Sequence, residues 1–366
     1  MSSTYKIITR EDSHFADQWN RFLQENTNTS PFYSLIWMDY QRHYSEDRFI
    51  KDLSFILVGQ DQTPLCICPL YLENYQGILR FAYRGEFLES LRTPLINNRI
   101  QRKVAKSVEE EAFAYIEQLA AHHQIAKINF LIDPLCAVYE DENFNYLTRY
   151  GYIDASISSQ LIHLTKSRED LWMELRKSYK ALINKGEKTY EVVIMDSKNP
   201  DFEFHETYRK LHFKAAGRVT RPLETFNLQF EMLKRDESML LGVKHNDQFV
   251  SCSYFVHNSR SAYYSSEADD PDVQVPVTYG PLSQWSAIEY YKNRGLEYME
   301  LDNQQFGPQV FDHPSNKDLS ISMFKRGFGG KTIPLFRGIK YYDKQLMEKE
   351  LTENMNQLIQ ELKHDQ

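Results

Sequence analysis

Apolar positions recur along the chain with two different spacings, which predict alternating helices and strands. Between residues 101 and 123 they lie three or four positions apart, which places them on one face of a helix. These residues are Val104, Val108, Ala112, Tyr115 and Leu119. The stretch that follows, "AKINFLIDP", is a short apolar run stopped by proline, which is typical of a buried strand.

The same criteria divide most of the chain into short strands and helices of medium length. Helices are predicted at residues 13–25, 101–123, 167–189, 202–214 and 222–235, and from Pro281 to Asn293. Strands are predicted within 53–72 and at 78–83, 126–134, 239–244, 249–257, 260–266 and 297–302. Strands and helices that alternate in this way are typical of a mixed α/β protein.

Two segments resemble each other and indicate an internal duplication. The segment "LVGQDQTPLCICPLYL" (57–72) aligns without gaps with "VKHNDQFVSCSYFVHN" (243–258), and this alignment matches Cys66 to Cys252. In each copy another strand, a long helix and a strand ending in aspartate follow. The shared order of elements favours duplication over chance. We therefore expect two similar domains, each a mixed and mostly antiparallel sheet with helices on its faces.

The duplication also suggests domain limits. Residues 1–155 would form the first domain and residues 156–340 the second, which leaves 341–366 as a C-terminal helix. Apolar residues in this tail recur at near-heptad spacing, so we expect the helix to dock on the protein. A coiled-coil dimer is the alternative, and both a monomer and a homodimer stay open.

Composition narrows the class of protein. Apolar residues make up 42% of the 366 residues, which is enough to build large cores and argues against global disorder. The net charge of −8 argues against DNA as a partner, because proteins that bind nucleic acid broadly are basic. The four cysteines show no CxxC pair, so we expect reduced thiols in a cytoplasmic protein.

The sequence shows no recognisable targeting signal and no metal-ligand pattern. The N-terminal sequence lacks the apolar core of a signal peptide, and the longest apolar runs are too short for a transmembrane segment. We expect a cytoplasmic protein, and contact with the inner face of a membrane stays open. His205 and His212 are seven positions apart on a predicted helix, which is too wide for two ligands of one metal ion. No metal site is expected.

A basic, glycine-rich stretch, "ISMFKRGFGGK", occupies residues 321–331. From residue 321 to 340 there are five basic residues and no acidic one, although the chain as a whole is acidic. The stretch lacks the first glycine that the phosphate-binding loop G-x-x-x-x-G-K-[ST] requires, and no helical pattern follows it. We therefore interpret the glycines as a turn and the basic residues as candidates for another role.

Several segments match a known family in order, from about residue 30 to residue 335. They are "SPFYSLIW", "LRTPLI", "FLIDP", "LTRYGY", "AYYSSEADD", "GPLSQWSAIEYYKNRGLEYMELD" and "MFKRGFGG". Together they resemble the Fem-type aminoacyltransferases and the related FemAB-like and BioF2-like enzymes. The resemblance implies two tandem domains of the GNAT acyltransferase fold. The chain departs from the family at Thr93, where glycine is usual, and it lacks the long two-helix arm of some members.

The resemblance implies an acyl-transfer centre at Phe324 and Lys325. When an amine attacks an ester or thioester, negative charge grows on the carbonyl oxygen, and a lysine held in a dry pocket can offset it. Phe324 would supply the dry wall. Asp302, at the end of the predicted strand "YMELD", is the candidate that takes the proton from the attacking amine. A turn aspartate without a catalytic role is the alternative for Asp302.

Other residues are candidates for binding the acceptor. Trp37 and Arg92 lie in segments that match the family, and the residues beside Trp37 are apolar where some members carry a basic residue, which disfavours a uridine-diphosphate muropeptide. Arg218 and Arg221 flank a predicted helix break, and their forked guanidinium groups suit phosphate or carboxylate. Tyr264 lies on a strand beside Tyr263, so one of the two faces the cleft.

The acyl donor and the activity stay open between alternatives. The free amides near Tyr279 and Gly280, at a predicted helix start, could hold an acyl donor. We favour an acyl-CoA such as acetyl-CoA and an amino sugar or anionic cell-envelope precursor as acceptor. The chain nevertheless lacks the GNAT pyrophosphate motif [QR]-x-x-G-x-[GA], because Lys331 stands where the motif requires glycine or alanine. An aminoacyl-tRNA-dependent Fem-type enzyme and a non-catalytic binding protein are the alternatives.

Overall fold

The chain folds into two compact units, each assembled from separate stretches of sequence. A computed structural model describes residues 5–27, 29–86, 89–136 and 144–364. Unit 1 comprises Met1–Ile157, Gly307–Pro314 and Pro334–Gln366. Unit 2 comprises Ser158–Phe306 and Ser315–Ile333. Each unit has its own apolar core, and the two are described separately below.

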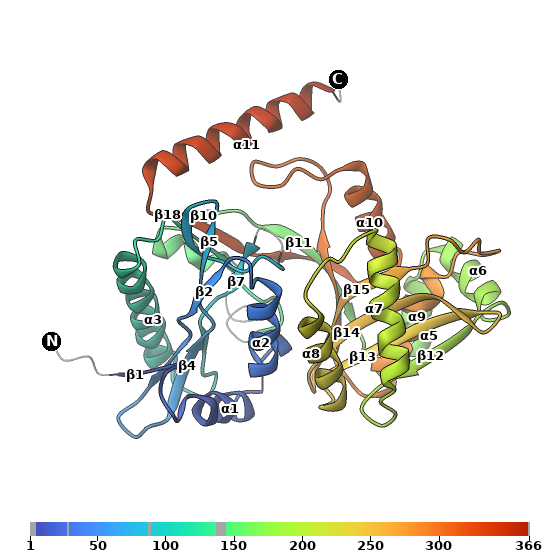
Figure 1. Ribbon diagram of the computed structural model, residues 1–366, viewed down its shortest axis with the longest axis horizontal. Coiled ribbons are helices and arrows are strands. Elements are labelled where there is room, and N and C mark those ends of the chain that lie inside the picture. The colour runs from blue at the N-terminus through green and yellow to red at the C-terminus, as the bar shows by residue number, and fades with distance from the viewer. Residues whose placement is uncertain (1–4, 28, 87–88, 137–143, 365–366) are drawn as a thin grey trace. The chain divides into compact units, whose positions relative to one another are not determined.

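Unit 1 is built on two sheets (Figure 1). Its helices are α1 (Phe15–Glu25), α2 (Leu35–Tyr44), α3 (Arg102–His122) and α11 (Lys344–His364). Its strands are β1 (Lys6–Thr9), β2 (Phe49–Asp52), β3 (Phe55–Val58), β4 (Pro64–Cys68), β5 (Tyr71–Tyr75), β6 (Ile78–Phe81), β7 (Leu91–Arg92), β8 (Leu95–Ile96), β9 (Lys127–Leu131), β10 (Ile153–Asp154) and β18 (Arg337–Tyr341). The strand orders are β1-β3-β4-β8 and β10-β18-β9-β6-β5-β2, and β7 also pairs with β9.

Strand β18 comes from the C-terminal part of the chain and completes the second sheet of unit 1. It pairs antiparallel with β9 on one side and with β10 on the other. Arg337, at its start, is 1% exposed and donates two hydrogen bonds to the carbonyl oxygen of Ala155. Burial lowers the pKa of Arg337 to about 10. The predicted limit at residue 340 had placed this strand in the second domain, because continuous domains were assumed.

Unit 2 is built on one sheet with the order β12-β13-β14-β15-β16-β11-β17. Its strands are β11 (Ile157–His163), β12 (Glu191–Met195), β13 (Ser238–His245), β14 (Gln248–His257), β15 (Ser261–Asp269), β16 (Tyr298–Gln304) and β17 (Lys331–Leu335). Its helices are α5 (Arg168–Glu174), α6 (Lys177–Gly186), α7 (Phe202–Ala216), α8 (Leu223–Lys234), α9 (Gly280–Asn293) and α10 (Asn316–Arg326). Within the described residues, no helix of either unit is long and apolar enough to cross a membrane.

Helices cover both faces of the unit 2 sheet, as neighbouring residues of β14 show. Ser253 hydrogen-bonds through its hydroxyl to Ser283 of α9 at 3.1 Å. The hydroxyl of the next residue, Tyr254, donates to the backbone oxygen of Gln229 in α8 at 2.8 Å. Because successive side chains of a strand point to opposite faces, α9 and α8 lie on opposite sides of the sheet.

Both units contain the expected order of elements, which confirms the predicted mixed α/β fold with a duplicated plan. In unit 1 strand β6 is followed by the long helix α3 and by β9, and β6 and β9 pair in parallel. In unit 2 strand β15 is followed by α9 and by β16, and this pair is again parallel. The strands that precede them form antiparallel hairpins in both units.

The two hairpins also share a bulge, but the gapless sequence alignment is wrong beyond the turn. In unit 1 the register shifts just after Leu57, which pairs with Cys66. In unit 2 it shifts just after Val243, which pairs with Ser251. Ser251, and not Cys252, is therefore the counterpart of Cys66. The reason is that the second turn is one residue shorter than the first.

Three helical segments differ from the sequence prediction. The helix expected at 167–189 is interrupted between α5 and α6, where the amide of Arg176 donates to the backbone oxygen of Gly327 at 2.9 Å. Helix α2 was predicted only as an aromatic segment. Helix α10 was not predicted, although Ser315 and Asp318 form a capping box at its start.

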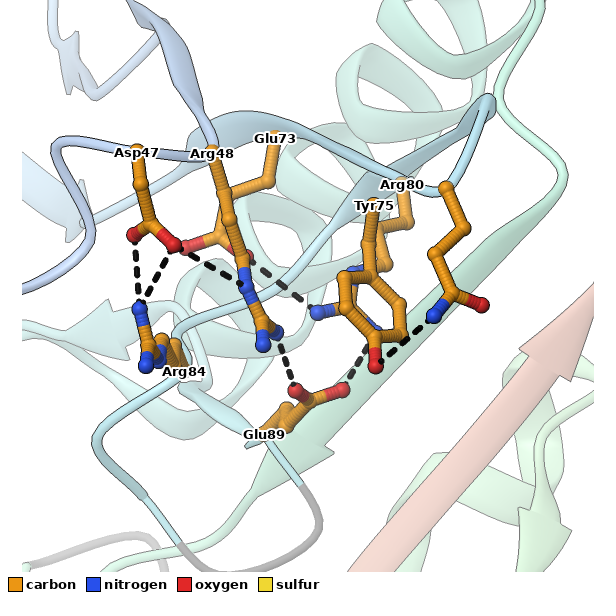
Figure 2. Close-up of polar contacts among 8 residues, drawn as sticks. Asp47, Arg48, Glu73, Tyr75, Arg80, Arg84 and Glu89 are labelled. Atoms are coloured by element: carbon orange, nitrogen blue, oxygen red, sulfur yellow. Dashed lines mark hydrogen bonds and ion pairs between the residues drawn. The ribbon is translucent and has the colours of Figure 1, made fainter.

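Buried ion pairs connect strands of unit 1 (Figure 2). The guanidinium of Arg80 contacts Glu73 at 3.5 Å and also donates to Glu89. Arg48 contacts the other oxygen of Glu89 at 2.7 Å, and the ring of Tyr75 lies against both arginines. Burial raises the pKa of Glu73, whereas hydrogen bonds from the two arginines outweigh burial and lower the pKa of Glu89. The network neutralises its own charges and holds β5 and β6 together.

Candidate functional site

The candidate site of unit 2 begins where the parallel strand pair ends. Strands β15 and β16 pair only over Ser261–Tyr263 and Tyr298–Glu300. Strand β16 then continues to Gln304 and stays paired with β11 on its other side. Within the described residues, its edge beyond Glu300 is therefore open toward β15. An open backbone edge with polar side chains around it can receive a ligand.

Asp302 occupies a strained position on this open edge. Its φ of +65° lies in the left-handed region that non-glycine residues rarely adopt, at a cost of about 1–3 kcal/mol. The register with β11 shifts at the same place, between Ser159 and Leu161. The strand thus bulges at Asp302 and does not end there, so the predicted alternation of Glu300 and Asp302 is interrupted. Glu300 is buried and accepts a hydrogen bond from Ser159.

Lys325 forms an ion pair with Asp302, a contact that the sequence did not predict. It lies near the end of α10, and its Nζ is 3.1 Å from Asp302 Oδ2. The side chain of Lys325 is 6% exposed, whereas that of Asp302 is 50% exposed. Two longer contacts, of 3.4 Å and 3.5 Å, join the same Nζ to the backbone and side-chain oxygens of Asn303. The ammonium is therefore held at the open edge in a largely dry position.

Aromatic rings pack around Phe324, the residue before Lys325 on α10. The ring of Phe324 lies 5.7 Å from that of Tyr179 and 5.1 Å from that of Phe328. A Cβ placed on Gly280 would lie 3.2 Å from Phe324, so the start of α9 abuts this ring. The structure thus brings Phe324, Lys325 and Gly280 together. Their roles in binding remain predictions.

A second group of polar side chains lies on β15 and at the start of α9. The hydroxyl of Tyr264 donates to Glu267, and that of Tyr279 hydrogen-bonds Asp269. Burial and the neighbouring charge of Asp269 raise the pKa of Glu267 to about 7. Burial also raises the pKa of Tyr264, with the charges of Glu267, Asp269 and Asp302 contributing.

Glu267 is the residue that the sequence analysis missed. It also accepts a hydrogen bond from the buried Ser251, at 3.4 Å, and Ser253 contributes another. Glu267 and Asp269 are two positions apart on one strand, so their side chains share a face. That spacing was readable in "AYYSSEADD", but nothing in the sequence shows that the face is partly buried. Burial is what gives one of these carboxyl groups an unusual pKa.

The predicted acceptor arginines of unit 2 lie away from this group. Arg221 is 7% exposed, donates to Tyr208 and to Gln229 Oε1 at 2.8 Å, and lies over the ring of Phe226. Tyr208 bonds Ser266, which faces opposite to Glu267 because the two are adjacent on β15. Arg221 thus lies on the α7–α8 side of the sheet. Arg218 is exposed between α7 and α8.

Trp37 and Arg92 belong to unit 1. Trp37 stacks on Tyr40 at 4.8 Å and meets the ring of Phe32 edge-on at 5.0 Å. The guanidinium of Arg92 lies 4.2 Å from the centre of the same Phe32 ring and donates to Glu86 at 2.9 Å. Trp37 and Arg92 therefore both contact one phenylalanine, Phe32. Their proposed role in binding the acceptor remains a prediction.

The histidines of α7 lie among aromatic rings. His205 and His212 both contact Tyr208, and burial lowers the pKa of each to about 4. In the part of the chain that the structure describes, no three His, Cys, Asp or Glu side chains are grouped so that they could hold a metal ion.

Comparison with known proteins gives structural neighbours only. No family model and no curated protein sequence matches the chain. FemX is similar in structure, with 12% identity, coverage of 94% of this chain and 99% of that chain, and a TM-score of 0.62. L-PGS from Bacillus licheniformis is similar with 9% identity, coverage of 92% and 95%, and a TM-score of 0.58.

A third neighbour is the C-terminal domain of a putative lysylphosphatidylglycerol synthetase from Agrobacterium fabrum. It has 9% identity, coverage of 92% of this chain and 96% of that chain, and a TM-score of 0.58. Each match spans both units of this chain. The likeness is one of fold, because identity is low throughout. The chain therefore has the fold of FemX, and the two-domain mixed α/β fold expected from the sequence is confirmed.

Proposed function

We propose that the chain is an N-acyltransferase whose reaction takes place at the open edge of β16 in unit 2. The observation that carries the proposal is the nearly buried ammonium of Lys325, held by Asp302 where the parallel strands part. A buried cation at an unpaired backbone edge has little structural purpose of its own, because removing an ammonium from water is costly. A reaction that develops negative charge there would use it.

The chemistry is direct aminolysis. The nitrogen of the acceptor amine attacks the carbonyl carbon of the acyl donor, the carbon–nitrogen bond forms, and the bond to the leaving sulfur or oxygen breaks. Negative charge passes through the carbonyl oxygen, and the Lys325 ammonium would stabilise it. The rings of Phe324 and Tyr179 would keep water away from the reacting atoms. No covalent enzyme intermediate is needed.

The proton that the acceptor nitrogen loses needs a base, and two carboxylates are available. Asp302 was the candidate from the sequence, but its Oδ2 is engaged by Lys325. Glu267 has a pKa of about 7, which suits a group that must be ionised before the reaction and protonated after it. We therefore assign Glu267 as the base that accepts the proton from the acceptor nitrogen, and Asp302 as the residue that positions Lys325.

The donor we propose is an acyl-CoA, with Tyr279 and Gly280 beside its acyl group. The start of α9 supports this assignment, because Gly280 lies against the ring of Phe324, the residue before Lys325, and helix amides there can hold an acyl donor. An aminoacyl-tRNA is the second candidate for the donor. The acceptor we propose is the amine of an amino sugar or of an anionic, lipid-linked or nucleotide-linked cell-envelope precursor.

The proposal is tested by incubating the protein with acetyl-CoA or longer acyl-CoAs and a panel of amines, and detecting products by mass spectrometry. Charged tRNA, tested in parallel, identifies the second donor class. We expect an amide product with an acyl-CoA. Transfer from charged tRNA alone would reverse the choice of donor. Absence of any acyl transfer, with the fold intact, would favour a binding protein instead.

A further inference from the structure

The surface next to Lys325 combines cations without carboxylate partners and large exposed apolar side chains. Arg326 follows Lys325 on α10, and Arg176 lies between α5 and α6. The Nη2 of Arg176 donates to the backbone oxygen of Met323 at 3.1 Å, which joins the two segments. Neither arginine forms an ion pair with a described residue. Burial and the charge of Arg176 lower the pKa of Arg326.

Two lysines extend the basic character of this surface. Lys177 is exposed at the start of α6. Lys180 donates to the backbone oxygen of Met173 at 3.1 Å and approaches its sulfur at 3.9 Å. The nearest carboxylate in sequence, Glu174, is already engaged by Lys166. Arg176 and Lys177 are exposed, and Lys180 and Arg326 are partly exposed, on a chain whose net charge is −8.

Three of the most exposed apolar side chains of the protein lie among these cations. Met173 is 71% exposed, Phe306 58% and Met323 51%. The guanidinium of Arg326 lies 4.5 Å from the centre of the Phe306 ring, and Arg176 and Lys180 contact the backbone at the two methionines. Exposed apolar groups gathered in one place indicate an interaction surface. We call these seven residues the cationic–apolar patch: Met173, Arg176, Lys177, Lys180, Phe306, Met323 and Arg326.

We propose that the cationic–apolar patch docks unit 2 onto an anionic phospholipid surface. Flexible methionine side chains and a phenylalanine can enter the boundary of the acyl chains, while arginine and lysine bind the phosphates around them. The acidic remainder of the chain is repelled by such a surface, which favours this one face. RNA would satisfy the cations, but its backbone offers no apolar surface that would cover two exposed methionines.

Docking at this patch would hold α10, the helix that carries Lys325, at the lipid surface. The inference nevertheless does not require the proposed reaction. A chain that binds anionic vesicles but transfers no acyl group would retain the docking surface and lose the proposed function. Transfer activity without vesicle binding would support the proposed function and contradict the docking surface.

The test is co-sedimentation of the full chain with vesicles of phosphatidylcholine alone and of phosphatidylcholine mixed with phosphatidylglycerol. We expect binding to the mixed vesicles only, weakening as salt is raised. The triple variant Arg176→Gln, Lys177→Gln, Lys180→Gln should bind about 100-fold more weakly. The variant Met173→Ser, Phe306→Ser, which keeps every charge, should also bind more weakly.

The controls are Lys198→Gln with Lys210→Gln, which removes two exposed charges, and Val219→Ser, which removes an exposed apolar side chain; all three residues lie on or beside α7 in unit 2. These variants should bind as the unchanged protein does. Equal binding to both kinds of vesicle, or the same loss in the controls as in the patch variants, would overturn the proposal. So would competition by tRNA that removes the protein from vesicles while no patch variant has an effect.

Discussion

At the scale of single residues, the site depends on placing charged groups where they are costly. Asp302 adopts a strained φ, Lys325 is nearly buried, and Glu267 is half-buried. Such features persist only when surrounding contacts impose them, and they cluster at functional sites. The sequence made Phe324, Lys325 and Asp302 candidates through a family resemblance, and their roles stay predictions. They could not identify Glu267, because its pKa depends on burial between β14, β15 and α9.

Replacing Glu267 by glutamine should remove the base while preserving shape. Transfer activity of the unchanged protein should rise with pH around a midpoint near 7, and Glu267→Gln should lower kcat by about 10²–10⁴-fold and abolish that rise. Asp269→Asn should shift the midpoint to lower pH, because it removes a neighbouring negative charge. An unchanged pH profile in Glu267→Gln would indicate that Asp302, and not Glu267, is the base.

The same carboxyl group should affect stability with a definite sign. Its pKa is raised in the folded state, so the folded chain binds more protons than the unfolded chain between pH 4.5 and about 7. Stability of unit 2 should therefore fall as pH rises through that range, by up to about 3 kcal/mol. In urea unfolding, Glu267→Gln should be more stable than the unchanged protein at pH 8 and similar to it at pH 4.5.

At the scale of elements, the long helices and the duplicated hairpins were predictable, and the bulges and turns were not. Helix α3 matches its expected range within one residue at each end, because its apolar face is regular. Helix α10 was not predicted, because the glycines that follow Lys325 indicate a turn. The pair Ser315 and Asp318, which forms the capping box of this helix, is nevertheless visible in the sequence. The sequence did not show that the two hairpin turns differ in length by one residue, because the alignment without gaps matches more identical residues.

Gly330, in the segment "RGFGGK", should not tolerate a side chain. Gly330 has φ of +76°, and a Cβ there would lie 2.2 Å from the backbone oxygen of Leu161. Gly330→Ala should therefore cost more than about 3 kcal/mol in the free energy of unfolding. Gly217→Ala is the matched control, because Gly217 has φ of +66° but open space around it, and should cost about 1 kcal/mol. Equal costs in the two variants would contradict this reading of the turn.

At the scale of the whole molecule, the path of the chain between units is what sequence reasoning could not supply. The predicted limits follow sequence order, whereas β18 completes a sheet whose other strands all precede residue 155. Burial of Arg337 and pairing on both edges of β18 come from tertiary contacts far apart in sequence. Local periodicity contains no information about such pairing.

Strand β18 should therefore be necessary for unit 1 to fold. A chain ending at residue 333 lacks β18 and should leave unit 1 unfolded, with its amides rapidly exchanging in hydrogen-exchange measurements. A chain ending at residue 342 lacks α11 but retains β18, and should keep β9 and β10 protected. Equal protection of β9 in both chains would contradict the assigned role of β18.

The central claim is that Lys325 stabilises negative charge during acyl transfer, and one measurement tests it most directly. Once a donor and acceptor pair is found, single-turnover rates are compared for the unchanged protein, Lys325→Ala and Lys317→Ala, an exposed lysine at the start of the same helix. The account predicts a loss of about 10²–10³-fold in Lys325→Ala and none in Lys317→Ala, with thermal unfolding of both close to that of the unchanged protein. A folded Lys325→Ala variant that transfers the acyl group at an unchanged rate would contradict it.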